Sequence, residues 1–146
     1  MFNKETEYAI RGLVYIQVQN SVGRRPGITE IAEEIAAPHF YTGKILQRLV
    51  KLGFVESLKG KGGGFGFNPQ KPELSLKTVV TAIEGTNLFE GCGIGLKECN
   101  HEKPCPIHNK FAPIRDSLEK LVSEETIQSL AIKVNEGNPA LMIYLK

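Results

Sequence analysis

Three cysteines in the second half of the chain are the residues best suited to chemistry. Cys92, Cys99 and Cys105 are separated by six and five residues. Thiolates at this spacing on one loop can ligate a metal ion or an iron–sulfur cluster, with one coordination position left for another residue. His108 lies three residues after Cys105, and His101 lies within the loop, so either could supply an imidazole nitrogen. No Cys-x-x-Cys pair occurs, so the pattern is not that of a zinc ribbon or a thioredoxin.

The composition around the cysteines bears on whether they form a site or are three unrelated thiols. Buried structural cysteines usually lie in periodic apolar segments. Residues 86–105 are instead rich in glycine and poor in apolar residues, which favours a ligating loop. An odd number of cysteines argues against a disulfide framework.

The whole chain has the length and composition of a globular protein. Its 146 residues are 41% hydrophobic and 23% charged, which fits one domain, or one compact domain with an appended arm. The longest apolar run covers six residues, 140–145, whereas a membrane span needs about 20. Charges in the first twenty residues break up any signal-peptide core. We therefore expect a cytoplasmic protein that does not bind membranes.

The charge is distributed unevenly along the chain. Residues 1–72 hold ten Lys/Arg and six Asp/Glu, whereas residues 73–146 hold eight Lys/Arg and ten Asp/Glu. A basic first half suits a polyanion partner such as nucleic acid, although a solvated basic face would give the same balance.

The first half predicts three helices followed by a hairpin. Apolar periodicity, caps and breakers predict helices over 5–20, over 29–36 with Thr29 as N-cap, and over 38–52 with Pro38 as first helical residue. Alternating residues 54–58 and 65–67 flank a turn, 59–64, that has four glycines and two lysines. This order is that of a winged helix-turn-helix, so the predicted fold is mainly α with a small β-hairpin wing.

A winged helix-turn-helix places its third helix in the major groove, and its hairpin tip can reach the adjacent minor groove. A flexible, cationic tip of six residues has no evident structural purpose, which favours DNA binding over a merely solvated basic helix face. The predicted DNA contacts are Thr29, His39, Tyr41, Thr42, Lys44, Gln47, Arg48, Lys59, Lys61 and Gly63.

The second half predicts helices around the cysteine loop. Ser75 caps a helix that ends at Glu84. After the loop, apolar residues recur at alternating spacings of four and three, which suits a helix that pairs with its twin; packing on the protein's own core is the alternative. Pro113 should kink this helix or mark its first turn. The apolar row consists of Ile107, Phe111, Ile114, Leu118 and Leu121.

Further along, Ser123 is expected to restart a helix over 124–134, and residues 140–145 resemble a strand that pairs with a sheet edge or a partner chain. The predicted organisation is a winged helix-turn-helix DNA-binding domain over 1–74. Residues 75–146 then carry the cysteine loop, 86–108, and the dimerisation helices.

Several stretches together resemble a known family. They are Tyr8-Ala-Ile-Arg-Gly-Leu, Ile31-Ala-Glu-Glu-Ile, Lys44-Ile-Leu-Gln-Arg-Leu-Val-Lys-Leu-Gly, Gly60-Lys-Gly-Gly-Gly-Phe and the loop that ends in Cys105-Pro-Ile-His. In combination they resemble the Rrf family of bacterial winged-helix transcriptional regulators, which includes IscR-type iron–sulfur regulators and NsrR-type nitric-oxide sensors.

The resemblance implies a homodimer joined by the long helix after the loop. It also implies a [2Fe–2S] or [4Fe–4S] cluster held by Cys92, Cys99 and Cys105. In the IscR type a histidine completes the ligand set, and His108 holds that place. In the NsrR type an acidic residue of the partner subunit completes it, which corresponds to Glu7. We favour His108 because imidazole is an established iron–sulfur ligand.

The function that follows is a DNA-binding repressor that senses redox state, nitric oxide or iron supply through the cluster and binds a double-stranded operator. The alternative is a winged-helix regulator whose cysteines bind zinc or act as a thiol switch without a cluster. An enzyme is not expected, because the sequence has no phosphate loop, no paired catalytic carboxylates and no His/Asp set beside a single activated cysteine.

Overall fold

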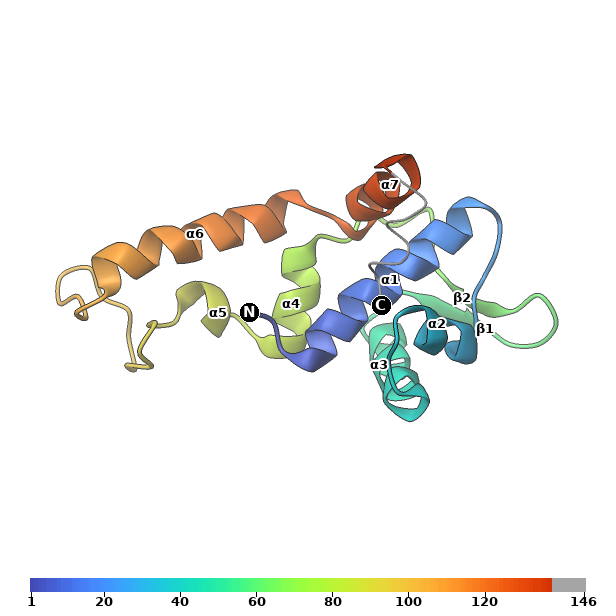
Figure 1. The fold of residues 1–146 in the computed structure, drawn as a ribbon, viewed down its shortest axis with the longest axis horizontal. Coiled ribbons are helices and arrows are strands. Elements are labelled where there is room, and N and C mark those ends of the chain that lie inside the picture. Colours follow the sequence, from blue (N-terminus) through green and yellow to red (C-terminus); the bar gives the residue numbers. More distant parts are fainter. Residues whose placement is uncertain (138–146) are drawn as a thin grey trace.

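The computed structural model describes residues 1–137, and this part of the chain is mainly helical with one two-stranded antiparallel sheet (Figure 1). The predicted fold class is therefore confirmed. The strand expected over 140–145 lies outside the described residues. In chain order the elements are α1 (Lys4–Ser21), α2 (Ile28–Glu34), α3 (His39–Lys51), β1 (Glu56–Leu58), β2 (Gly64–Gly66), α4 (Leu76–Glu84), α5 (Asn87–Glu90), α6 (His108–Glu124) and α7 (Ile127–Gly137).

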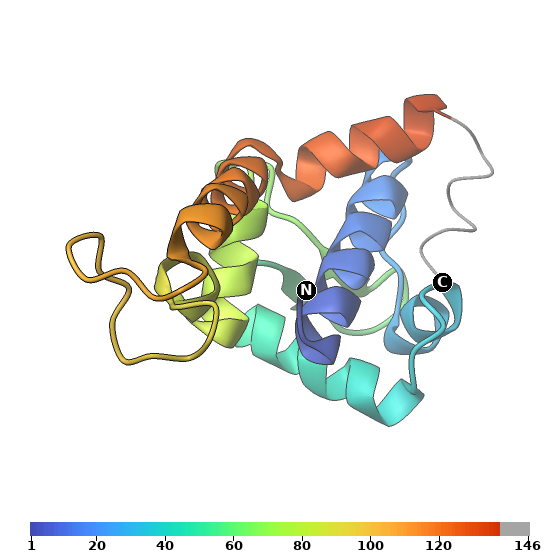
Figure 2. The same ribbon diagram turned by 60° about the vertical axis from the view of Figure 1, so that its left-hand side comes forward.

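Helix α1 is the centre of the fold. The Asn3 side chain accepts a hydrogen bond from the Thr6 amide and caps the helix, as the preference for Asn at this position predicts. Ala9, Leu13 and Ile16 are fully buried, because α1 packs against α2 and α3 on one side and α4 and α7 on the other. Figures 1 and 2 show α1 between these two groups of helices.

The helix-turn-helix begins two residues earlier than the sequence predicted. Gly27 is the N-cap of α2, so Thr29 lies inside the helix and is not its cap. The Thr29 hydroxyl is 3.1 Å from the His39 Nε2 atom, so it faces the start of α3 instead. Pro38 is the N-cap of α3 and not its first helical residue, because its ψ of 133° is extended.

The turn between α2 and α3 contains a strained residue. Ala36 is the one non-glycine residue with a positive φ, 51°, among those described. The left-handed conformation costs an L-residue about 1–2 kcal/mol, whereas glycine adopts it freely but loses about 0.5–1 kcal/mol of chain entropy. We expect Ala36→Gly to stabilise the protein by about 0.5–1 kcal/mol, measured as a higher denaturation midpoint.

The neighbouring residue provides the control for this substitution. Ala37 packs against the core and has no positive φ, so Ala37→Gly should destabilise the protein. An Ala36→Gly protein that is no more stable than the wild type would contradict the expected relief of strain.

The predicted wing is present and is closed by glycines. β1 and β2 pair with Ser57 opposite Phe65. A Cβ atom on Gly63 would lie 2.3 Å from the Leu58 carbonyl oxygen, and one on Gly64 would lie 2.3 Å from the Arg25 carbonyl oxygen. The backbone segments approach so closely that no side chain fits at either position.

The second half differs from the prediction in three places. Ser75 caps α4 as expected, but a short helix, α5, interrupts the segment predicted to be irregular. Helix α6 starts at His108 and continues through Pro113, so the proline is not in its first turn. Helix α6 also runs past Ser123, and the next helix starts at Ile127 because Thr126 and Ser129 cap each other through their side chains and amides.

The hydrophobic core crosses the predicted boundary at residue 74. Leu76 donates its amide to the Glu125 carbonyl, and Ile127 donates its amide to the Leu74 carbonyl. Val80 and Ile127 belong to the same buried cluster as Leu13. Helices α4 and α7 therefore complete the core of the winged helix, whereas α6 and the cysteine loop extend away from it (Figures 1 and 2).

Candidate nucleic-acid interface and cysteine loop

The N-terminal half of α3 presents an exposed, basic and aromatic face. His39, Lys44 and Gln47 are exposed, as expected of residues that contact DNA. Phe40 is 75% exposed, and the Lys44 ammonium lies 4.7 Å from the centre of its ring. Sequence reasoning missed Phe40. The helical position of Phe40 could have indicated its exposure, because it is out of phase with the buried Thr42 and the rest of the apolar stripe.

Two other predicted DNA contacts on α3, Thr42 and Tyr41, have partners within the chain. The Thr42 side chain is 2% exposed and donates a hydrogen bond to the Pro38 carbonyl, so it has no surface to offer a base. The Tyr41 ring packs edge-on against Tyr8 at 5.7 Å. The burial of Thr42 corrects the prediction, because helical side chains 100° apart cannot all face one groove. Tyr41 is only half-buried, so its contact with DNA stays a prediction.

Arg48 has internal partners. Its guanidinium is 2.6 Å from the Glu5 carboxylate and donates to the carbonyls of Ala82 and Ile83 at 3.3 and 3.5 Å. These contacts join α3 to α1 and to the end of α4. The structure therefore gives Arg48 a packing role, but its side chain is 42% exposed, and its contact with DNA stays a prediction.

The wing tip carries the predicted lysines. Lys59 and Lys61 are both exposed at the turn between β1 and β2. Gly63 closes the turn, as described above, and has no side chain with which to contact DNA. Lysines on a glycine-rich turn can follow the phosphate backbone closely.

A further cation, missed by the sequence reasoning, lies at the base of the wing. The Arg25 guanidinium packs on Gly66, where its Nη1 atom is 2.7 Å from the position a Cβ would occupy. This buried Nη1 atom has no hydrogen-bond partner within residues 1–137. The Arg24–Arg25 pair in the loop before α2 could have indicated this cation.

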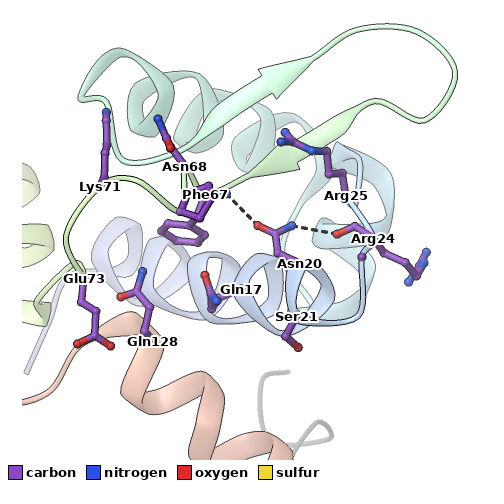
Figure 3. A pocket seen from close by; sticks show the side chains of 12 residues that line it. Gln17, Asn20, Ser21, Arg24, Arg25, Phe67, Asn68, Lys71, Glu73 and Gln128 are labelled. Carbon is purple, nitrogen blue, oxygen red and sulfur yellow. Dashed lines mark hydrogen bonds between the residues drawn. The ribbon is translucent and has the colours of Figure 1, made fainter.

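Asn20 holds the base of the wing on α1, beside a hollow of about 430 Å³ (Figure 3). Its side-chain oxygen accepts from the Phe67 amide at 2.8 Å, and its side-chain nitrogen donates to the Arg24 carbonyl at 2.9 Å and the Phe65 carbonyl at 3.3 Å. One side chain therefore fixes both the exit of β2 and the loop that carries Arg25.

The cysteine loop places Cys99 in a polar contact with α6. Its Sγ atom is 3.2 Å from Nδ1 of His108 and 3.0 Å from a guanidinium nitrogen of Arg115. His108 is 4% exposed, and its Nε2 atom is 2.8 Å from Nδ1 of His101. The hydrogen bond to the Cys99 sulfur raises the pKa of Arg115 above its ordinary value, although burial acts in the opposite direction.

The other two cysteines lie together. Backbone amides of Ile94 and Leu96 donate to the Cys92 sulfur and, with the Cys105 side chain, lower the pKa of the Cys92 thiol, although burial acts in the opposite direction. A Cβ atom on Gly93 would lie 3.0 Å from the Phe111 ring, so this part of the loop sits directly on α6.

The donor set fits an iron–sulfur cluster by its chemistry. It supplies three thiols, with amides directed at one sulfur, and an imidazole in contact with another. The donors lie in two pairs, Cys92 with Cys105 and Cys99 with His108, and within residues 1–137 no three metal-binding side chains converge on one point. All three thiols are free.

The predicted dimerisation row lies along α6. Ile114 is 68% exposed, and Ile107 and Leu121 are also exposed, whereas Leu118 packs partly against the core. An exposed apolar row on a projecting helix suits the association of two chains.

Comparison with known proteins identifies the family. The Rrf2 family, described as an iron-dependent transcriptional regulator, matches residues 2–133 of the chain. The chain belongs to the Rrf2 family. It is similar to the transcriptional repressor NsrR of Streptomyces coelicolor, with 28% identity over 104 residues that cover 71% of this chain and 66% of that protein.

Two solved structures share the fold. CymR, the global cysteine regulator of B. subtilis, superposes with a TM-score of 0.70 at 16% identity and covers 90% of this chain and 96% of its own. IscR of T. potens superposes with a TM-score of 0.69 at 16% identity and covers 96% of this chain and 90% of its own. The Rrf2 protein is thus a DNA-binding winged-helix transcriptional regulator and not an enzyme. Over residues 1–137 no helix combines the length and apolarity that a membrane crossing requires.

Proposed function

We propose that this Rrf2-family regulator is a cytoplasmic, homodimeric repressor that senses redox state, nitric oxide or iron supply through an iron–sulfur cluster. The proposed ligands are Cys92, Cys99, Cys105 and His108. The observation that carries the proposal is the polar contact between Cys99 and the buried His108, on a loop that supplies two further thiols. The description of the family as iron-dependent supports it.

Operator binding would use the exposed end of α3 and the wing. His39, Phe40, Lys44 and Gln47 are available to base edges and phosphates in the major groove, and an exposed aromatic ring suits the methyl group of thymine. Lys59 and Lys61 would contact the adjacent minor groove. Two such surfaces must lie about 34–36 Å apart to occupy both half-sites of an operator.

Helix α6 would connect the cysteine loop to the distance between the two DNA-binding surfaces. The loop packs on α6 through Gly93 and ends at His108, the first residue of that helix. A bound cluster would supply redox and ligand-exchange chemistry, and the chain's own residues hold the thiols and the imidazole against α6. A change in the loop would therefore alter how two α6 helices pair, and with them the distance between the recognition helices.

The test is to purify the full chain without oxygen and to measure its absorption spectrum with iron and sulfide per chain. We expect broad absorption above about 300 nm with matched iron and sulfide. Cys92→Ala should bleach the protein, because one of three thiolate ligands is lost. Asn100→Ala, in the same loop but without a ligand atom for iron, should stay coloured.

Two results would contradict the cluster. A colourless wild-type protein with about one zinc per chain would indicate a structural metal site. A colourless protein without metal would indicate a thiol switch. The alternative fourth ligand is Glu7 of the partner subunit, and Glu7→Gln tests it. In its own chain Glu7 pairs with Lys4 at 3.1 Å.

A further inference from the structure

Arg115 is a buried cation in the middle of the projecting helix α6. It is 8% exposed, although it lies on a helix whose neighbouring residue Ile114 is 68% exposed. A buried charge is costly unless hydrogen bonds and opposite charges compensate for it. The position therefore requires partners, and those partners indicate what the residue does.

The partners of Arg115 come mainly from the cysteine loop. One terminal nitrogen, Nη1, donates to the Gly91 carbonyl at 3.2 Å and lies 3.0 Å from the Cys99 sulfur. The nearest carboxylate, Asp116, is 3.5 Å away, but its side chain is 65% exposed, so solvent weakens this pair. The Nε atom is buried without a partner in the described part of the chain. The half-buried Cys99 sulfur is thus the partner through which Arg115 contacts the three cysteines.

The two contacts lie at separate points of the loop. Gly91 precedes the first cysteine, and Cys99 is the second. A single guanidinium therefore fastens the start and the middle of the loop to the helix that carries the exposed apolar row. Both contacts are made by the same nitrogen, Nη1, so one donor group holds two points of the loop.

We propose that Arg115 is the positioning residue that couples the cysteine loop to α6, through its hydrogen bonds to the Gly91 carbonyl and the Cys99 sulfur. The guanidinium is a charged donor, which makes each of these hydrogen bonds stronger than one from a neutral donor. Any change at Cys99 that removes the sulfur as an acceptor weakens this link. An effect of Arg115 on a bound cluster rests on the proposed function, whereas its two hydrogen bonds are made within the chain.

The experiment is hydrogen–deuterium exchange on the full chain, reduced and free of metal. Arg115→Met should increase exchange of the loop amides of Gly91 and Gly95 about tenfold, which corresponds to the loss of one charge-assisted hydrogen bond. Lys120→Met removes an exposed charge from the same helix and should leave the loop unchanged. Arg115→Lys should give an intermediate result and is the variant to use if Arg115→Met does not fold. Unchanged loop exchange in both Arg115 variants would overturn the proposal.

A second measurement separates this proposal from the proposed function. In protein loaded with a cluster, Arg115→Lys should retain its iron but show a lower reduction potential, because a donor to a ligand sulfur is lost. An unchanged potential would overturn the sulfur contact. If the wild type binds no iron, the cluster proposal fails, and the exchange experiment still decides whether Arg115 holds the loop.

Discussion

Operator binding is expected to fall by about 100-fold or more when Lys44 and Lys61 are both replaced by glutamate, because two phosphate contacts per subunit become repulsions. The slope of log affinity against log salt should also become shallower by about 1 for each lost contact. Both side chains are exposed, so the fold should not change. The measurement is a salt titration of binding to DNA fragments selected by the wild-type protein from a random library.

The control variant changes the net charge by the same amount as the Lys44 and Lys61 variant. Lys103 and Lys120 are exposed in the second half of the chain, far from α3 and the wing in sequence. Lys103→Glu with Lys120→Glu should leave operator affinity within a few-fold of the wild type, because unspecific charge effects are screened beyond about 10 Å at 0.1 M salt. Equal weakening by both pairs would contradict the assigned interface.

The second large effect is expected at Ile114. This side chain is 68% exposed in the single chain, so Ile114→Asp should not unfold the protein. In a dimer paired along the row on α6, it would bury two charges opposite each other, which costs several kcal/mol. We expect a monomer in sedimentation experiments, with operator affinity reduced by about 100-fold or more because a single half-site contact remains.

Ser123 offers a matched comparison for Ile114. It is exposed on α6, nine residues further along and therefore on the opposite side of the helix. Ser123→Asp adds the same charge and should leave the dimer intact. A dimeric Ile114→Asp protein would show that the chains pair through another surface.

The winged helix could be predicted from the sequence because its signals are local. Gly53 and the glycines of the hairpin mark breaks in the chain, and Leu46 and Leu49 repeat with helical spacing. Errors fell at boundaries such as Thr29 and Pro38, where a cap residue and a first helical residue have similar composition.

The direction of individual side chains was harder to predict. Arg48 and Lys44 look alike in the sequence, yet Arg48 points to Glu5, which is 43 residues away, and Lys44 to solvent. The buried Thr42 and the exposed Phe40 reverse what their polarity suggests. The ion pair of Arg48 depends on long-range packing, which a single sequence does not display, whereas the helical phase of Phe40 was a local signal.

The cysteine loop shows the same division between local and long-range information. The spacing of Cys92, Cys99 and Cys105 indicated a ligating loop, and His108 followed directly. The contact of Arg115 with Cys99 joins residues 16 positions apart, across a loop with no periodic pattern. Nothing in the sequence marked Arg115 among the other charged residues of α6.

The packing of α7 on α1 has a consequence for synthesis of the protein. The last described helix covers the first one, and the buried Ile127 belongs to the same cluster as Leu13. During synthesis, α3 and the wing therefore leave the ribosome long before the residues that complete the core of the winged helix. We expect the winged helix to become stable only after residues 127–137 have left the exit tunnel, so nascent chains stalled earlier should remain sensitive to proteases.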